Sequence, residues 1–151
     1  MDYNNYEELH ELIKNVVGEN YTLASANIIY LEELDSKSFV IYMTQFRDAF
    51  THLANIYSTD VMLNKEYVLE QLERVNGHLE RIVIDSYRKI CDRFLWAIRK
   101  TKRWKDVSNY ELQIAQKIKE LRMCEENISF EQKKNGFHDL IIYMESILNK
   151  E

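Results

Sequence analysis

An arginine, an aspartate and a histidine stand close together in the chain, at Arg47, Asp48 and His52. Histidine titrates near neutral pH and can accept or donate a proton. Arginine stays charged, and its planar fork fits phosphate oxygens. Cleavage of RNA by its own 2′-hydroxyl needs these groups: an acceptor for the hydroxyl proton, a donor for the leaving 5′-oxygen, and positive charge on the phosphate. Arg47 and His52 are therefore candidate catalytic residues, and Asp48 is a candidate to orient one of them.

These residues lie in a stretch, 38–57, that is predicted to be an amphipathic helix. Its apolar residues recur at alternating spacings of four and three, which predicts a buried stripe made of Phe39, Met43, Phe46, Phe50, Leu53 and Tyr57. Five residues of helix turn through about 500°, so Arg47 and His52 should point about 140° apart. They can act on one phosphate only if the helix kinks between them, or if a second copy of the chain supplies the other group.

The stretch from Phe46 to Leu53 resembles the signature of the HEPN superfamily, an arginine followed, after a short spacer that begins with a polar residue, by a histidine. The stretch from Gln71 to Arg81 resembles the long helix that follows in some bacterial members. The resemblance implies an all-α bundle, a homodimer with a composite cleft and, in active members, metal-independent RNA cleavage. It further implies a toxin or anti-phage defence role, with a cognate antitoxin or defence-system protein as a possible partner.

Other interpretations stay open. Many HEPN members are non-catalytic modules, so the chain is alternatively a helical module that binds RNA, a nucleotide or a protein partner. The spacing of Arg47 and His52 is also compatible with coincidence. Members paired with a nucleotidyltransferase antitoxin often have a tyrosine two positions after the histidine, where this chain has Ala54.

A second histidine, His78, precedes Arg81 and Asp85 on one predicted helix. One hypothesis makes these three residues supporting or substrate-contacting groups at the cleft. The alternative is a partly buried histidine beside a surface ion pair between Arg81 and Asp85, which are four residues apart.

A basic segment follows the same predicted helix in an otherwise acidic chain. Phosphate contacts together with stacking of a tryptophan on a base would make it an RNA-binding surface. The alternative is that positive charge near a helix C-terminus only complements the helix dipole. The candidate RNA-binding residues are Arg99, Lys100, Lys102, Arg103 and Trp104.

The composition predicts the fold class. The chain has 151 residues, no proline and three glycines, which favours long helices over a turn-rich β fold. We expect one all-α domain over residues 1–151, an antiparallel bundle of four to six helices. Gly18 should end a first helix, the longest helix should continue through Gly77, and Ser129 with Gln132 should form a capping box. The expected helices cover residues 3–17, 22–34, 38–57, 64–100, 107–123 and 129–148.

The remaining composition limits the function. A formal net charge of −5 argues against binding nucleic acid by overall charge, so an RNA role must be local. No apolar run reaches the roughly 20 residues that cross a bilayer, and no secretory signal precedes the first helix, so we expect a cytoplasmic protein. Cys91 and Cys124 are expected to be reduced thiols. No pattern of ligands or glycine-rich loop predicts a metal or another cofactor.

Overall fold

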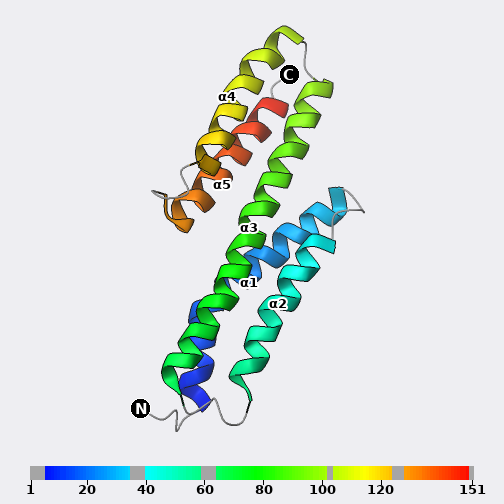
Figure 1. Cartoon of the computed structure of the whole chain (residues 1–151). Helices are drawn as coiled ribbons and strands as arrows, with labels where there is room; N and C mark the ends of the chain where they lie inside the picture. The colour runs from blue at the N-terminus through cyan, green and yellow to red at the C-terminus, as the bar shows by residue number, and fades with distance from the viewer. Residues whose placement is uncertain (1–5, 35–39, 59–63, 102–103, 124–127, 150–151) are drawn as a thin grey trace. The chain divides into compact units, whose positions relative to one another are not determined.

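The computed structural model describes residues 6–34, 40–58, 64–101, 104–123 and 128–149, and within them it contains five α-helices (Figure 1). The prediction of an all-α helical bundle is therefore confirmed. The helices are α1 (Tyr6–Leu34), α2 (Val40–Ile56), α3 (Lys65–Thr101), α4 (Trp104–Met123) and α5 (Phe130–Leu148). Backbone contacts group the chain into two compact units, residues 1–83 and 84–151, and α3 contributes to both. That the whole chain is one domain stays a prediction.

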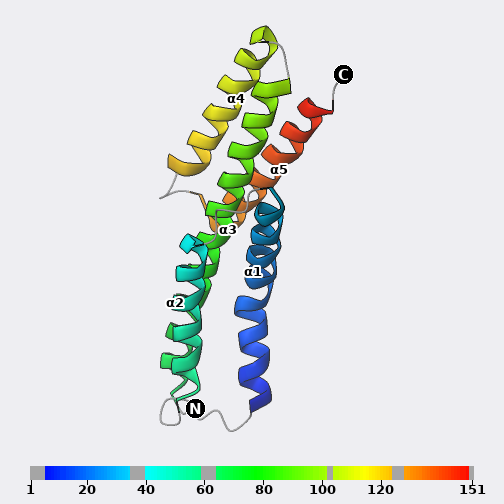
Figure 2. The ribbon, with the colours of Figure 1, turned by 90° about the vertical axis from the view of Figure 1, so that its right-hand side faces the viewer.

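The first unit consists of α1, α2 and the first half of α3, which lie alongside one another (Figure 2). The buried apolar residues of α1 and α2 recur at intervals of seven or eight, so a narrow line of apolar side chains on each helix faces the core. On α3 the buried positions alternate by three and four. The apolar core of this unit consists of Leu9, Val17, Ala24, Leu31, Tyr42, Ala49, Ile56, Val68, Leu72, Val75, Leu79, Ile82 and Val83.

The prediction of two N-terminal helices separated at Gly18 is wrong, because α1 is one helix of 29 residues that runs through this glycine. No glycine in the described residues has a positive φ, so Gly18 does not form the expected cap. Thr22, inside this helix, donates a hydrogen bond from its hydroxyl to the Gly18 carbonyl at 2.9 Å. Such a back-bond is available inside a helix, and one glycine is too weak a break to end one.

The predicted buried stripe of α2 is wrong in part: Phe46 and Leu53 are half-buried, but other members are exposed. Met43, Phe50 and Tyr57 are 62%, 55% and 55% exposed, whereas Tyr42, Ala49 and Ile56 are buried. Phe39 lies outside the described residues. The helix is therefore rotated about its axis by roughly one residue, or about 100°, from the orientation that its hydrophobic pattern predicts. As a consequence, the polar side chains beside the buried line face α3.

The predicted long helix is confirmed, since α3 runs without interruption through Gly77. The side chain of Asn64 accepts a hydrogen bond from the Tyr67 backbone N–H at 3.2 Å and so satisfies one of the free donors at the helix start.

The second unit contains the rest of α3 with α4 and α5, and its core is mainly apolar, with Ser86 as a buried polar residue. The rings of Tyr87 on α3 and Phe137 on α5 stack with centroids 6.4 Å apart. A Cβ atom built at Gly136 would lie 2.5 Å from Leu121, so this glycine allows α4 and α5 to approach closely. The capping box of Ser129 at the start of α5 is confirmed. The buried residues of α5 are Phe137, Leu140, Met144 and Ile147.

Candidate functional site

Arg47 lies on α2 and pairs with its neighbour Asp48. The Arg47 Nη2 and Nε atoms donate to Oδ1 of Asp48 at 2.8 and 3.1 Å. The Arg47 side chain is 72% exposed. This hydrogen bond lowers the pKa of Asp48; desolvation opposes the shift, and the charges of Arg47 and of two nearby histidines add to it. Asp48 is therefore ionised at neutral pH and orients Arg47.

His52 is half-buried on the opposite side of α2, where it contacts α3. Its Nδ1 lies 2.8 Å from Oε1 of Gln71, a buried residue of α3. Nδ2 of Asn55 donates to the same oxygen at 3.5 Å. Both Arg47 and His52 are described by the structure, and no hydrogen bond joins them. The two candidate catalytic groups of one chain are therefore not brought together.

The structure instead pairs His52 with His78. Nδ1 of His78 lies 2.8 Å from Oε1 of Gln45 on α2. The two imidazole rings stack with centroids 5.5 Å apart and planes inclined by 22°. Each histidine is thus held by a glutamine of the facing helix, and each packs against the other.

These hydrogen bonds decide which ring nitrogen can exchange a proton. A glutamine Oε1 can only accept, so Nδ1 of each histidine carries the hydrogen that it donates. In the neutral ring Nε2 then has the free lone pair and acts as the base. His52 and His78 are therefore fixed as Nδ1–H tautomers, with Nε2 available for chemistry.

Charge in this region favours a neutral His78. Burial lowers the pKa of His78 below its ordinary value, and the positive charges of Arg81 and His52 lower it further, while Asp48 opposes them. A proton on one imidazole therefore disfavours a proton on the other. His78 is therefore mainly neutral at neutral pH.

We call this set of side chains the polar seam: Gln45, His52, Asn55, Gln71 and His78. Sequence reasoning selected the two histidines but missed the glutamines and Asn55. A signal was present, because Gln45, Asp48, His52 and Asn55 recur on α2 at spacings of three and four. In the sequence alone, that pattern is typical of a solvent-exposed helix face. The α3 residues that complete the seam lie too far along the chain to be assigned to it from sequence.

A shallow pocket opens on α3 next to the polar seam. It has a volume of about 330 Å³ and is lined by Glu70, Glu73, Arg74, Gly77, His78 and Arg81. Arg74 donates to Glu70 at 2.6 Å. A Cβ atom built at Gly77 would have nothing within 4 Å, so the centre of this surface is open. The pocket combines two guanidinium groups, two carboxylates and an imidazole.

Arg81 and Asp85 are both exposed. Within the part of the chain that the structure describes, no ion pair joins Arg81 to Asp85. Asp85 belongs to the second unit. Arg81 contributes instead to the pocket and to the electrostatic environment of His78.

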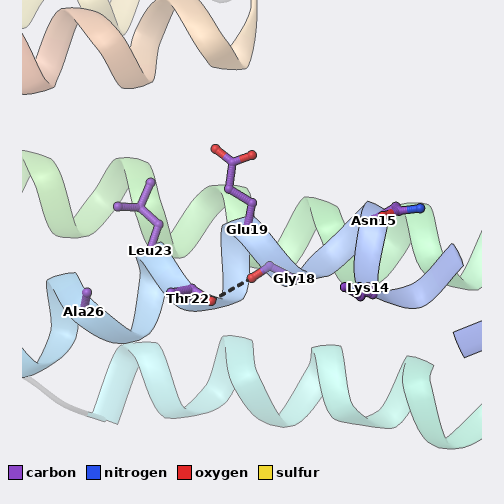
Figure 3. A pocket seen from close by; sticks show the side chains of 7 residues that line it. All are labelled: Lys14, Asn15, Gly18, Glu19, Thr22, Leu23 and Ala26. Carbon is purple, nitrogen blue, oxygen red and sulfur yellow. Dashed lines mark hydrogen bonds between the residues drawn. The ribbon is translucent and has the colours of Figure 1, made fainter. Parts of the chain in front are cut away.

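A larger hollow of about 750 Å³ lies along α1 (Figure 3). Every residue that lines it comes from this one helix, and Figure 3 shows Glu19 and Leu23 extending to the same side of it. Among the described residues, Lys14 and Glu19 are the charged side chains that line it, and neither histidine of the polar seam does. Its size alone does not make it a functional site.

The predicted RNA-binding segment lies in the second unit, where only part of it is described. Arg99 forms an ion pair with Glu111, and the ammonium of Lys100 lies 4.1 Å from the centre of the Trp96 ring. Lys102, Arg103 and the Trp104 side chain lie outside the described part, although Trp104 is the first residue of α4. Trp96, which sequence reasoning missed, is 53% exposed.

Cys91 is a free, buried thiol of the second unit. Burial raises the pKa of Cys91 to about 12. This thiol is therefore not a reactive nucleophile at neutral pH. Cys124 lies outside the described residues.

Comparison with known proteins gives the chain no relative: no family model matches it, nor does any curated protein or solved structure. Within the described residues, no helix combines the length and the apolar character that crossing a membrane requires. The same residues contain no cluster of three or more histidine, cysteine, aspartate or glutamate side chains that could hold a metal ion.

Proposed function

We propose that the chain is an endoribonuclease that cleaves RNA by attack of the 2′-hydroxyl, without a metal ion, and acts as a homodimer. The observation that carries this proposal is His52, a half-buried histidine held by Gln71 with Nε2 as its free base. The resemblance of residues 46–53 to the HEPN signature supports the same chemistry. Toxin or anti-phage defence activity, with a protein partner that restrains or activates the chain, belongs to this proposal.

The proposed reaction uses His52 as the general acid and base. Nε2 of His52 takes the 2′-hydroxyl proton as the 2′-oxygen attacks phosphorus. The bond from phosphorus to the 5′-oxygen breaks, and the 5′-oxygen receives a proton. The products are a 2′,3′-cyclic phosphate and a 5′-hydroxyl. An arginine on the phosphate stabilises the negative charge that develops in the transition state.

The geometry of α2 favours an arginine from the second copy. Within one chain Arg47 pairs with Asp48 and does not contact His52. A two-fold dimer can place Arg47 of one copy opposite His52 of the other. Each active site would then need both chains.

The first test is cleavage of total RNA and of tRNA in EDTA by the wild type and by His52→Ala. We expect the wild type to leave 2′,3′-cyclic ends and His52→Ala to lose at least about a hundredfold in rate, the usual contribution of acid–base catalysis. His138→Ala, at an exposed histidine of the second unit, is the matched control and should cleave normally. Unchanged cleavage by His52→Ala would overturn the proposed mechanism.

The second test mixes two inactive variants, Arg47→Ala and His52→Ala. If Arg47 and His52 act from different chains, each mixed dimer keeps one intact site, and roughly half of the wild-type activity returns in those dimers. If the two residues act from the same chain, both sites of a mixed dimer are damaged and no activity returns. A monomeric wild type in sedimentation, at the 18.2 kDa chain mass, would exclude a shared site.

A non-catalytic RNA-binding module is the second candidate. It is favoured by the exposed pair of Arg47 with Asp48 and by the exposed ring of Trp96 beside Lys100. RNA binding without cleavage, in a protein confirmed to be a dimer, would support this candidate.

A further inference from the structure

Gly77 lies inside a long helix without a structural reason to be glycine. Its φ is not positive, and a Cβ atom there would meet nothing within 4 Å. Glycine destabilises a helix interior relative to alanine. Gly136 differs, because Leu121 occupies the space that its Cβ would need. The glycine leaves bare backbone at this position, which a molecule from outside can approach closely.

The charges around Gly77 are arranged along one face of α3. Glu73, Gly77 and Arg81 are four residues apart, so they follow one another on the same face. They place a carboxylate at one end, open backbone in the middle and a guanidinium at the other. The two charged Cα positions are about 12 Å apart along the helix axis. His78 lines the same pocket and contacts Gln45 of the polar seam.

The two ends of this surface suit two different chemical groups of a ligand. Arg81 offers a fork of donors that suits phosphate oxygens. Glu73, an exposed carboxylate at the other end, can only accept. Two adjacent N–H donors on the Watson–Crick edge of a base, as guanine has, match its two oxygens. The volume of about 330 Å³ is at the small end of the range for ligand sites and suits one small ligand.

We propose that this pocket binds one unpaired guanosine nucleotide of an RNA strand, its base edge on Glu73, its phosphate on Arg81 and its body over Gly77. The inference rests on the proposed function in taking the ligand to be part of an RNA substrate. It adds a specificity site on α3 beside the polar seam and predicts cleavage near unpaired guanosines.

The pocket can be tested without any cleavage by titrating the wild-type protein with guanosine 5′-monophosphate and following backbone amides by NMR. The chain has three glycines, so each amide can be followed separately. We expect the Gly77 amide to shift while those of Gly18 and Gly136 stay in place. Uridine 5′-monophosphate should bind more weakly, and inorganic phosphate should move Gly77 little.

Variants then separate the parts of the pocket. Gly77→Leu fills the open centre and should weaken binding at least about tenfold, as should Arg81→Gln, which removes a charged hydrogen bond. Glu73→Gln should remove the preference for guanosine over uridine monophosphate. Gly18→Leu on α1 is the matched control, since its Cβ would meet only Lys14 at 4.0 Å.

Three results would overturn the proposed nucleotide site. The Gly77 amide could stay unmoved by millimolar guanosine monophosphate, or it could shift equally with inorganic phosphate alone. Gly77→Leu and Arg81→Gln could also both leave binding unchanged. The outcome is independent of the His52→Ala experiment. Binding at Gly77 in a protein that cleaves no RNA would support the proposed nucleotide site and contradict the proposed nuclease activity. Cleavage that depends on His52, with no binding at Gly77, would support the nuclease activity and contradict the nucleotide site.

Discussion

Both units have an apolar core, but the first unit also has the polar seam between α2 and α3. In the second unit the Tyr87 ring of α3 stacks on the Phe137 ring of α5, and Phe137 and Met144 are fully buried. In the first unit α3 meets α2 through two histidines held by glutamines. α1 adds a further amide contact, Asn20 to Asn76 at 2.8 Å.

This difference separates stability from function within one chain. Apolar burial contributes roughly 25 cal/mol for each Å² removed from water, whereas a hydrogen bond nets only about 1 kcal/mol because water must be given up to make it. The polar seam therefore adds little stability, but it holds two titratable rings in one orientation. We interpret apolar burial as what stabilises both units, and the polar seam as the part of the first unit that carries the chemistry.

The largest expected effect is in the apolar unit. Phe137→Ala removes a ring that is 0% exposed and stacked on Tyr87. Such a cavity should lower the free energy of unfolding by about 3–5 kcal/mol. Urea unfolding measures the loss, and amide exchange should rise most in α5. A loss under about 1 kcal/mol would mean that the second unit is not packed as described.

The next effect is in the polar seam. Gln71→Ala leaves the His52 Nδ1–H without its acceptor and should cost about 1–3 kcal/mol of unfolding free energy. The double variant His52→Leu with Gln71→Leu removes both partners and should cost less than Gln71→Ala alone. Urea unfolding of both proteins makes the comparison. If the double variant is instead the less stable, the seam stabilises the fold more than its hydrogen bonds explain.

Replacing two of the glycines by alanine should change stability less, and in opposite directions. Gly136→Ala forces Leu121 to move and should lower stability by about 1 kcal/mol net, since overpacking outweighs the gain in helix propensity. Gly18→Ala meets no close atom and should raise stability by about 0.5–1 kcal/mol. Thermal unfolding followed by circular dichroism measures both. Stabilisation by Gly136→Ala would show that Leu121 yields freely.

The smallest expected effect is a pH dependence. Burial lowers the pKa of His78 in the folded chain, so the unfolded chain binds this proton more readily. The contribution of His78 to stability is full above its unfolded pKa of about 6.5 and is lost as the pH falls through the lower folded value. Urea midpoints at pH 7.5, 6.5 and 5.5 should decline less steeply in His78→Gln. Parallel declines in both proteins would contradict this role.

Part of the molecule could be predicted from the sequence because helix formation is local. The absence of proline and the three-and-four spacing predicted the all-α class and the uninterrupted α3, and Ser129 with Gln132 predicted the start of α5. Gly18 misled, because a single glycine costs a helix only about 1 kcal/mol, which tertiary packing exceeds. The hydrophobic stripe of α2 misled for another reason: aromatic rings such as Phe50 were assumed to be buried.

The candidate site shows the same division. The sequence determined which side chains were present: Arg47, Asp48 and His52 on one helix, and His78 and Arg81 on another. Only the tertiary structure decided that α2 turns Tyr42 and Ala49 inward, that His52 consequently faces His78, and that Arg47 faces away. Backbone hydrogen bonds within four residues fix a helix, but its rotation and register against a neighbour depend on side chains from both helices. The sequence of either helix alone therefore does not determine that pairing.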